Sequence, residues 1–315
     1  MNRLATETYA AQVHDGLGEG QGKRALITGL RGFTGYYVAA ELTAAGYRVF
    51  GTVLPGEEAG PDIFQVDLRD RAAVAAMVEQ VQPDVVVHLA GIAFVAHSDA
   101  EMMYRVNVAG TRNLLEALAA ARHQSSAVLL ASSANIYGNA DIKLIDENVA
   151  PAPANDYAVS KLAMEYMARL WMDRLPIIIS RPFNYSGRGQ AENFLLPKIV
   201  SHFRRGERKI ELGNLAIARD FSDVRTVATA YRRLLAAAPA GQAFNICSGQ
   251  SHSIAEVIDT ISDLAGYRIE VEVNPAFVRA NDVLNLAGNN AKLTSVVGAI
   301  EPIPLVETLR WMYQA

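Results

Sequence analysis

From Arg24 to Pro182, short apolar runs alternate with longer stretches in which apolar residues recur with a helical period. The short runs are rich in Val, Ile, Leu and Ala, and they predict strands at 24–28, 47–53, 63–67, 84–90, 127–132 and 177–182. The stretches between them predict helices at 33–45, 71–80, 102–121 and 157–171. Apolar strands that alternate with helices are typical of a parallel sheet whose two faces are both covered. The pattern therefore predicts an α/β fold built on a doubly wound parallel sheet.

Beyond Pro182 the alternation weakens, which indicates a second and smaller body. A chain of 315 residues is long for one core and short for two full domains. We expect a flexible, Gly-rich leader over 1–22 and a first domain over 23–184 plus about 216–246. The remaining segments, about 185–215 and 247–315, are expected to form a smaller α+β lobe.

The composition is that of an ordinary globular protein, with 50% hydrophobic and 20% charged residues. A net charge of −4 gives no indication of nucleic acid or an anionic membrane as a partner. No run approaches the roughly 18 apolar residues that span a bilayer, and the leader lacks a secretory pattern. The single cysteine, Cys247, has no partner for an internal disulfide, so a reducing cytoplasm is the expected compartment.

A glycine-rich turn follows the first predicted strand and opens the first predicted helix. Gly29 permits a tight turn, Gly32 lets the backbone approach a pyrophosphate, and Gly35 lets helix and strand pack closely. The free N–H groups at the start of the helix then face the anion. This turn predicts a dinucleotide-binding (Rossmann) sheet.

The residues around this turn bear on which dinucleotide is bound. The second strand ends at Val53 and Leu54, with no carboxylate to hold a ribose diol. Arg31 lies inside the glycine loop, where its guanidinium can pair with a 2′-phosphate, which favours NADPH/NADP while NADH/NAD stays possible. Asp67, at the end of the third strand, either accepts a hydrogen bond from the adenine amine or caps the next helix.

Tyr157 and Lys161 lie four residues apart on one predicted helix and therefore share a face. A tyrosine has an ordinary pKa of about 10, and the lysine charge is expected to lower it toward the range where it exchanges a proton. Ser133, after the fifth strand, is expected to place a hydroxyl near the same substrate oxygen. Together with the dinucleotide, these residues predict hydride transfer at a carbon that bears a hydroxyl or keto group.

The chain resembles an extended short-chain dehydrogenase/reductase that acts on nucleotide sugars, over about residues 23 to 313. The shared motifs, in family order, are Gly29-x-x-Gly32-x-x-Gly35, His88-Leu89-Ala90-Gly91, Asn107-Val108-x-Gly110-Thr111, Ser132-Ser133-x-x-x-Tyr137-Gly138 and Tyr157-x-x-x-Lys161. The resemblance implies that Tyr157 is the acid–base residue, that Lys161 also binds the nicotinamide ribose and that Ser133 assists. It also implies further contacts to the cofactor from Phe33, Leu68, Leu89, Ala90, Gly91 and Asn107.

The distal half resembles the branch of that family that modifies GDP-mannose. The runs that carry this are Arg181-Pro182-Phe183-Asn184, Gly213-Asn214-Leu215, Arg219-Asp220-Phe221 and Asn274-Pro275. Lys198, Arg219 and Arg279 are isolated cations in this half, which suits a diphosphate ligand. The resemblance implies that Arg219 and Arg279 hold the diphosphate of a GDP-linked 6-deoxy-hexose, that Asn184 holds the sugar or a phosphate, and that Asn193 lines the nucleotide pocket. No metal site is expected.

The position after Ser133 separates the reactions within the family. The dehydratases carry a glutamate there that removes the C5 proton, whereas this chain has Ala134 and Asn135, and an amide is not a base. Asn135 is expected to hydrogen-bond the sugar instead. The resemblance thus implies reduction of the C4 ketone of GDP-4-keto-6-deoxy-D-mannose to GDP-D-rhamnose. A nucleotide-sugar 4-epimerase is the alternative, and a GDP-mannose 4,6-dehydratase is less favoured.

Two further expectations concern specificity and assembly. Many relatives place a serine near the sugar after the fourth strand, where this chain has Ala93, so the tolerated sugars are open. The predicted helices Met102–Ala121 and Tyr157–Trp171 resemble those through which relatives form a homodimer with a four-helix interface.

Overall fold

The computed structural model describes residues 18–93, 99–140, 142–215, 217–277 and 285–315. The first 17 residues of the expected leader and Arg279 lie outside these ranges. Within the described residues, no helix is both long enough and apolar enough to cross a bilayer.

The larger body is built on a seven-stranded sheet in the order β10-β6-β5-β4-β1-β2-β3, and every neighbouring pair is parallel. The strands are β1 (Arg24–Thr28), β2 (Arg48–Val53), β3 (Ile63–Gln65), β4 (Val85–His88), β5 (Ala127–Ala131), β6 (Ile177–Pro182) and β10 (Gln242–Ile246). β4 and β6 are buried along their whole length, because they are central strands whose two faces are both covered by helices. The predicted doubly wound parallel sheet is confirmed.

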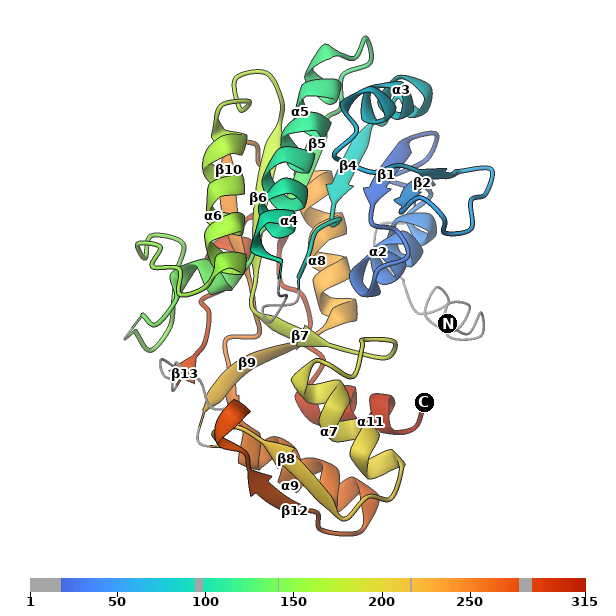
Figure 1. Cartoon of the computed structure of the whole chain (residues 1–315). Coiled ribbons are helices and arrows are strands. Elements are labelled where there is room, and N and C mark those ends of the chain that lie inside the picture. Colours follow the sequence, from blue (N-terminus) through green and yellow to red (C-terminus); the bar gives the residue numbers. More distant parts are fainter. Residues whose placement is uncertain (1–17, 94–98, 141, 216, 278–284) are drawn as a thin grey trace.

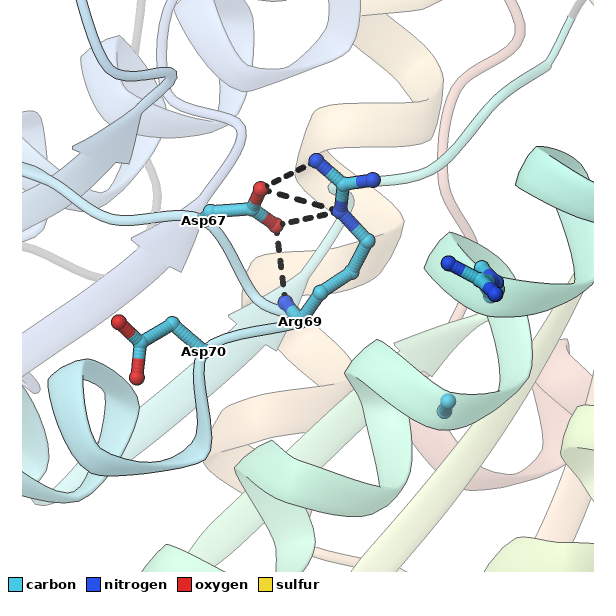
Figure 2. A pocket seen from close by; sticks show the side chains of 5 residues that line it. Asp67, Arg69 and Asp70 are labelled. Atoms are coloured by element: carbon cyan, nitrogen blue, oxygen red, sulfur yellow. Dashed lines mark hydrogen bonds and ion pairs between the residues drawn. The ribbon is translucent and has the colours of Figure 1, made fainter.

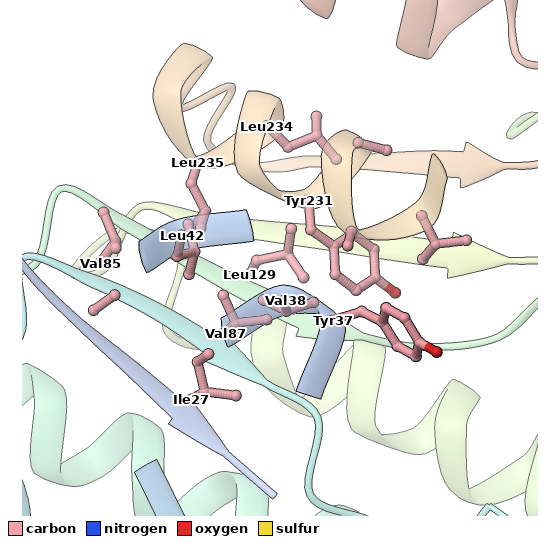
Figure 3. Close-up of a cluster of buried hydrophobic side chains, with 14 of the residues drawn as sticks. Ile27, Tyr37, Val38, Leu42, Val85, Val87, Leu129, Tyr231, Leu234 and Leu235 are labelled. Carbon is pink, nitrogen blue, oxygen red and sulfur yellow. The ribbon is translucent and has the colours of Figure 1, made fainter. Parts of the chain in front are cut away.

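Helices cover both faces of this sheet (Figure 1). The helices on one face are α2 (Phe33–Ala44) and α8 (Val224–Ala237), and those on the other are α3 (Arg71–Val81), α5 (Thr111–Ala120) and α6 (Asp156–Arg169). In Figure 3, Val38 and Leu42 of α2 lie with Leu234 of α8 against the sheet side chains Ile27 and Leu129. All five are fully buried, and burying one side chain of this size contributes about 2 kcal/mol.

The segment predicted as one helix over 102–121 is divided in the structure. It consists of α4 (Ala100–Tyr104), a π-helical segment η1 (Arg105–Gly110) and then α5. A π segment inserts extra backbone per turn and is frequent at functional sites. Here it contains Asn107, which is buried and makes hydrogen bonds to two other parts of the site. The spacing of apolar residues in the sequence does not reveal such an insertion, so the prediction gave one continuous helix.

A smaller lobe follows β6 and has its own apolar core. Its strands are β7 (Asn184–Ser186), β9 (Ala218–Asp223), β11 (Ser251–Ser253) and β13 (Asn285–Leu286), together with the parallel pair β8 (Lys209–Leu212) and β12 (Glu270–Val273). Its helices are α7 (Leu195–Arg204), α9 (Ile254–Ala265) and α11 (Leu305–Tyr313); the short helices η2 (Ala134–Tyr137), η3 (Pro275–Phe277) and α10 (Ala291–Val297) complete the fold. β7 begins two residues after β6 and pairs with β9, so the lobe is tied to the end of the large sheet where strands β1, β4, β5 and β6 also end (Figure 1).

Candidate active site

The glycine turn between β1 and α2 is a cradle in which a side chain would not fit. Gly29 has φ +74°, and a Cβ on it would lie 3.0 Å from the Ala90 Cα. A Cβ on Gly35 would lie 2.4 Å from the Gly29 carbonyl oxygen. α2 begins at Phe33 with Gly32 as its N-cap and without a side-chain cap, so its first N–H groups stay available to an anion. β1 and β4 are neighbours at the point where strand order reverses, which is where doubly wound sheets bind dinucleotides. The residues here fit a dinucleotide.

A chain of buried hydrogen bonds joins this turn to the helices beside it. The Thr28 hydroxyl lies 2.7 Å from Nδ1 of His88, whose Nε2 lies 2.8 Å from the Thr111 hydroxyl. The Thr111 hydroxyl donates its own proton to the Asn107 carbonyl, so it must accept from His88. His88 is therefore the neutral Nε2–H tautomer, with Nδ1 accepting from Thr28. Burial, together with the nearby Lys161 charge, lowers the pKa of His88 to about 3, which agrees with a neutral ring.

Asn107 holds the segment after β4 against helix α6. Its Oδ1 accepts from the Ile92 backbone N–H at 2.8 Å, and its Nδ2 donates to the Ser160 hydroxyl at 3.0 Å. Gly91 lies in the same contact, because a Cβ there would be 2.8 Å from Asn107 Oδ1 and 3.5 Å from Lys161 Nζ. The motif residues Leu89, Ala90 and Gly91 thus run past the glycine turn and end beside Lys161.

Tyr157 and Lys161 lie on the first turns of α6, and both are buried, with Tyr157 8% and Lys161 7% exposed. The helix begins where it does because Asn155 caps it, accepting from the Ala158 N–H at 2.9 Å. Lys161 Nζ donates to the Ala131 carbonyl at the end of β5, at 2.8 Å. This bond fixes the ammonium at the carboxyl edge of the sheet, next to the segment that carries Ser133.

Ser133 is placed as a hydrogen-bond donor. Its Oγ accepts from the backbone N–H and from the side-chain Nδ2 of Asn135, each at 3.1 Å. A hydroxyl has two lone pairs and one proton, so the O–H remains to donate to another oxygen. The interaction of Ser133 with Tyr157 lowers the pKa of the phenol, which is the effect of a donor on a phenolate. Asn135 is exposed, and its amide orients Ser133.

The predicted direction of the Tyr157 pKa shift is wrong in this structure. Burial raises the pKa of Tyr157 to about 12, and the hydrogen bond from Ser133 offsets only part of that rise. Burial also lowers the pKa of Lys161 to about 8, against the opposing charge of Glu165. The sequence argument counted the charge of the lysine and omitted the desolvation of both groups. Tyr157 is consequently protonated near pH 7, the form that a proton donor needs.

Asp67 pairs with a neighbouring arginine and does not cap a helix. Its carboxylate accepts from the backbone N–H of Arg69 at 2.9 Å and from the Arg69 guanidinium at 3.0 Å, which lowers the Asp67 pKa (Figure 2). Asp70 caps α3 instead. These three residues line an open hollow of about 460 Å³ together with Arg105 and Ala109. Leu68 is buried and packs against Gly110, so the hollow lies directly beside the π segment.

Arg31 is partly exposed at the mouth of the glycine turn. Its guanidinium lies 3.8 Å from the Glu58 carboxylate, whose side chain is 88% exposed. An exposed pair at this separation contributes little, so a phosphate can displace the carboxylate at small cost. The geometry leaves Arg31 able to meet a 2′-phosphate.

The predicted substrate residues are spread over the lobe that faces the site. Asn184 is exposed on β7, which pairs with the strand of Arg219, and Asn193 is exposed just before α7. Arg219 donates to the Ala218 carbonyl at 2.9 Å. Lys198 donates to the Glu211 carbonyl at 2.7 Å and lies 4.6 Å from the ring centre of Phe277, contacts that tie it to the lobe. The ligand of each of these residues stays a prediction.

Sequence reasoning missed two supports of the site. His88 stood in a recognised motif but received no role, although a histidine at the end of an apolar strand is a signal of a buried polar network. Glu165 was overlooked, although it follows Lys161 by four residues on the same helix face. Its partner, Arg181, was noted only as part of a motif.

Comparisons with known proteins agree with this geometry. A family model described as GDP-mannose 4,6 dehydratase matches residues 26–310. The chain is 34% identical to GDP-6-deoxy-D-talose 4-dehydrogenase of Aggregatibacter actinomycetemcomitans, over 87% of this chain and 90% of that protein. It is also 34% identical to GDP-6-deoxy-D-mannose reductase of Pseudomonas aeruginosa, over 91% of this chain and 95% of that protein.

Two solved structures are similar to nearly the whole chain. One, from Burkholderia cenocepacia J2315 and provisionally described as an epimerase, is 53% identical with a TM-score of 0.89, and covers 94% of this chain and 98% of its own. The other, a Pseudomonas aeruginosa protein named RMD solved with NADPH, is 31% identical with a TM-score of 0.81, and covers 93% of this chain and 98% of its own.

Proposed function

The chain belongs to the GDP-mannose 4,6 dehydratase family of NAD(P)-dependent enzymes, within the extended short-chain dehydrogenases/reductases, and from this membership we propose that it is a GDP-sugar 4-ketoreductase. The substrate is GDP-4-keto-6-deoxy-D-mannose and the product is GDP-D-rhamnose. The roles of Tyr157, Lys161 and Ser133 in this reaction are proposed with it.

The observation that carries this proposal is the arrangement around Ser133. A protonated Tyr157, a charged Lys161 and a serine whose O–H donates toward Tyr157 gather at the carboxyl edge of the sheet. These groups serve a reaction in which a carbonyl oxygen receives a proton. The dehydration that the family name describes needs a base at the next positions, and Ala134 and Asn135 supply none.

In the proposed reaction a nicotinamide cofactor supplies the hydride that C4 receives. Tyr157 donates its phenolic proton to the C4 oxygen, so the ketone becomes a hydroxyl and Tyr157 becomes a phenolate. Ser133 donates a hydrogen bond to the same oxygen while its negative charge develops. The Lys161 ammonium then stabilises the phenolate until a solvent proton restores the phenol.

The C4 hydroxyl of the product can have either of two configurations. The two 34%-identical relatives bear names that refer to 6-deoxy-mannose and 6-deoxy-talose, sugars that differ only at C4. Both relatives are 34% identical to this chain, so the rhamnose product is proposed from the motifs of the distal half. The face of the ketone to which the hydride is transferred determines which of these two sugars is formed.

A 4-epimerase is the second candidate, because the 53%-identical structure is provisionally described as one. An epimerase uses the same tyrosine and lysine but retains its cofactor through the cycle. It would turn over a reduced sugar without added NADPH, whereas a reductase consumes one NADPH for each ketone.

The cofactor preference, assembly and compartment belong to the same proposal. Arg31 supports NADPH over NADH, because it can pair with a 2′-phosphate and β2 ends without a carboxylate. Val159 and Tyr166 of α6 and Leu170 at its C-terminal cap are exposed apolar residues, which supports a homodimer with a four-helix interface. We place the enzyme in the cytoplasm and its sugar-binding residues on the lobe that follows β6.

The test is to incubate the purified protein with GDP-4-keto-6-deoxy-D-mannose and either NADPH or NADH. We expect the absorbance of NADPH to fall in step with loss of the ketone, and more slowly with NADH. A protein that consumes neither cofactor is not a 4-ketoreductase. Turnover of GDP-D-rhamnose in the absence of added cofactor would favour the epimerase.

A further inference from the structure

A buried ion pair lies behind the catalytic helix. Arg181 of β6 donates to the two oxygens of Glu165 of α6, from Nε at 3.0 Å and from Nη2 at 2.7 Å. The side chains are 5% and 0% exposed. A two-point contact of this kind fixes the orientation of the carboxylate as well as its position.

The rest of the guanidinium is also bound, so the pair has one geometry. Arg181 Nη1 donates to the Tyr137 hydroxyl at 2.9 Å and to the Glu147 carbonyl at 3.3 Å. The Tyr137 hydroxyl in turn donates to Asn245 Oδ1 of β10 at 2.8 Å. The Arg181 guanidinium thus contacts three separate parts of the chain, at Glu165, Tyr137 and Glu147.

Glu165 lies one helical turn after Lys161 on the same face of α6, where side chains are neighbours. Lys161 is buried, and the hydrogen bond to Ala131 involves only one of its three protons. An ammonium in such a place is unstable unless a negative charge compensates it. The titratable or charged groups on the elements packed around it include Tyr157, Glu165, His88, Arg181, Tyr137, Glu147 and Tyr185.

We propose that Glu165, oriented by Arg181, is a positioning residue whose carboxylate keeps the buried Lys161 in its charged form. His88 is neutral, Tyr137 and Tyr157 are protonated near pH 7, and the Glu147 carboxylate accepts from the Asn245 N–H. Glu165 is therefore the carboxylate that acts on Lys161 from its own helix, and it opposes the effect of burial on the Lys161 pKa. The catalytic consequence rests on the proposed function; the charge interaction between Glu165 and Lys161 does not.

The first test needs no substrate. The free energy of unfolding is measured for the wild type, E165Q, K161M and the double variant, near pH 7 and near pH 10. E165Q leaves Arg181 without its partner, but so does the double variant. The cost of that unpaired charge therefore cancels when the effect of E165Q is compared with and without Lys161. Lys161 is charged below its pKa of about 8 and neutral above it. We expect a coupling of at least about fivefold in the unfolding equilibrium constant near pH 7 and none near pH 10.

A coupling of zero at both pH values overturns the proposal. If E165Q does not fold, the cycle is run in the R181M background, with R181M, E165Q/R181M, K161M/R181M and the triple variant. Arg181 is then absent from all four proteins, so the coupling again reports only Glu165 and Lys161, and it is expected near pH 7 and not near pH 10.

The second test is the pH profile of the proposed reduction. Removal of the Glu165 charge lowers the Lys161 pKa further, so the alkaline limb of the E165Q profile should move down by about one pH unit. E165D keeps the carboxylate charge, so the alkaline limb of its profile should stay at the wild-type pH even if the variant is less stable. E41Q is the matched control, because it also breaks a buried ion pair. Glu41 is 1% exposed and accepts a 2.9 Å hydrogen bond from the buried Arg232 of α8.

The outcomes separate the two proposals. A limb that moves in E165Q but not in E165D or E41Q supports the role of Glu165, and a limb that moves equally in all three overturns it. Coupling in the unfolding cycle without any ketoreduction by the wild type would leave Glu165 in place and overturn the proposed function.

Discussion

The neutral state of His88 makes the stability of the protein depend on pH in a defined window. The unfolded chain binds a proton at His88 with a pKa of about 6.5, whereas burial holds the folded-state pKa at about 3. Between these values the unfolded state binds more protons, so the free energy of unfolding falls as pH falls. The contribution of His88 is fully present above about pH 6.5.

The magnitude follows from the size of that window. A full proton difference changes the free energy of unfolding by about 1.4 kcal/mol per pH unit. His88 therefore accounts for a loss of about 2 kcal/mol between about pH 6.5 and about pH 5. The measurements stop near pH 5, so that His88 stays neutral in the folded protein over the whole range. The quantity measured is the slope of the free energy of unfolding against pH.

The assay is urea unfolding at a series of pH values in the wild type and in His88→Gln. Glutamine can donate to Thr111 but does not replace the Nδ1 acceptor, so it should cost about 1 kcal/mol near pH 7. The variant should then lose about 2 kcal/mol less than the wild type on acidification. Parallel curves for His88→Gln would refute the assignment of a neutral, buried ring.

Three more variants test the site. Tyr157→Phe removes the proton donor, so kcat should fall by about 10²- to 10⁴-fold while cofactor affinity, measured by fluorescence titration, stays within about threefold; an unchanged kcat would remove Tyr157 from the mechanism. Gly91→Ala forces Asn107 from its contact with a Cβ 2.8 Å away and should destabilise the protein by about 1–3 kcal/mol in urea unfolding, whereas Gly60→Ala, whose Cβ would meet Ile63 at 3.5 Å, should not. Arg31→Met should raise the KM for NADPH by about tenfold and leave that for NADH unchanged; equal effects on both would show that Arg31 does not read the 2′-phosphate.

The sheet and the glycine turn could be predicted from the sequence because the residues that make them are local signals. The run Val85-Val86-Val87 has side chains that suit only a strand buried on both faces, and it forms β4. Gly29 and Gly35 are glycines because backbone atoms lie where a Cβ would be. Such constraints act within a few residues and therefore appear in the sequence.

The features that could not be predicted depend on burial and on distant partners. The π segment contains Asn107, whose bonds to Ile92 and Ser160 form only when the chain has folded. The raised pKa of Tyr157 follows from desolvation, which a motif does not report. The pair of Glu165 and Arg181 forms only when α6 packs on β6.

The central claim is that C4 of the sugar receives hydride from the cofactor while its oxygen receives a proton from Tyr157. The most direct measurement is NMR of the product made from GDP-4-keto-6-deoxy-D-mannose and NADPH that carries deuterium at the transferred position. The account predicts GDP-D-rhamnose with one deuterium at C4 and an equal amount of oxidised cofactor. A product without deuterium at C4, or one labelled at C5 or C6 instead, would contradict it.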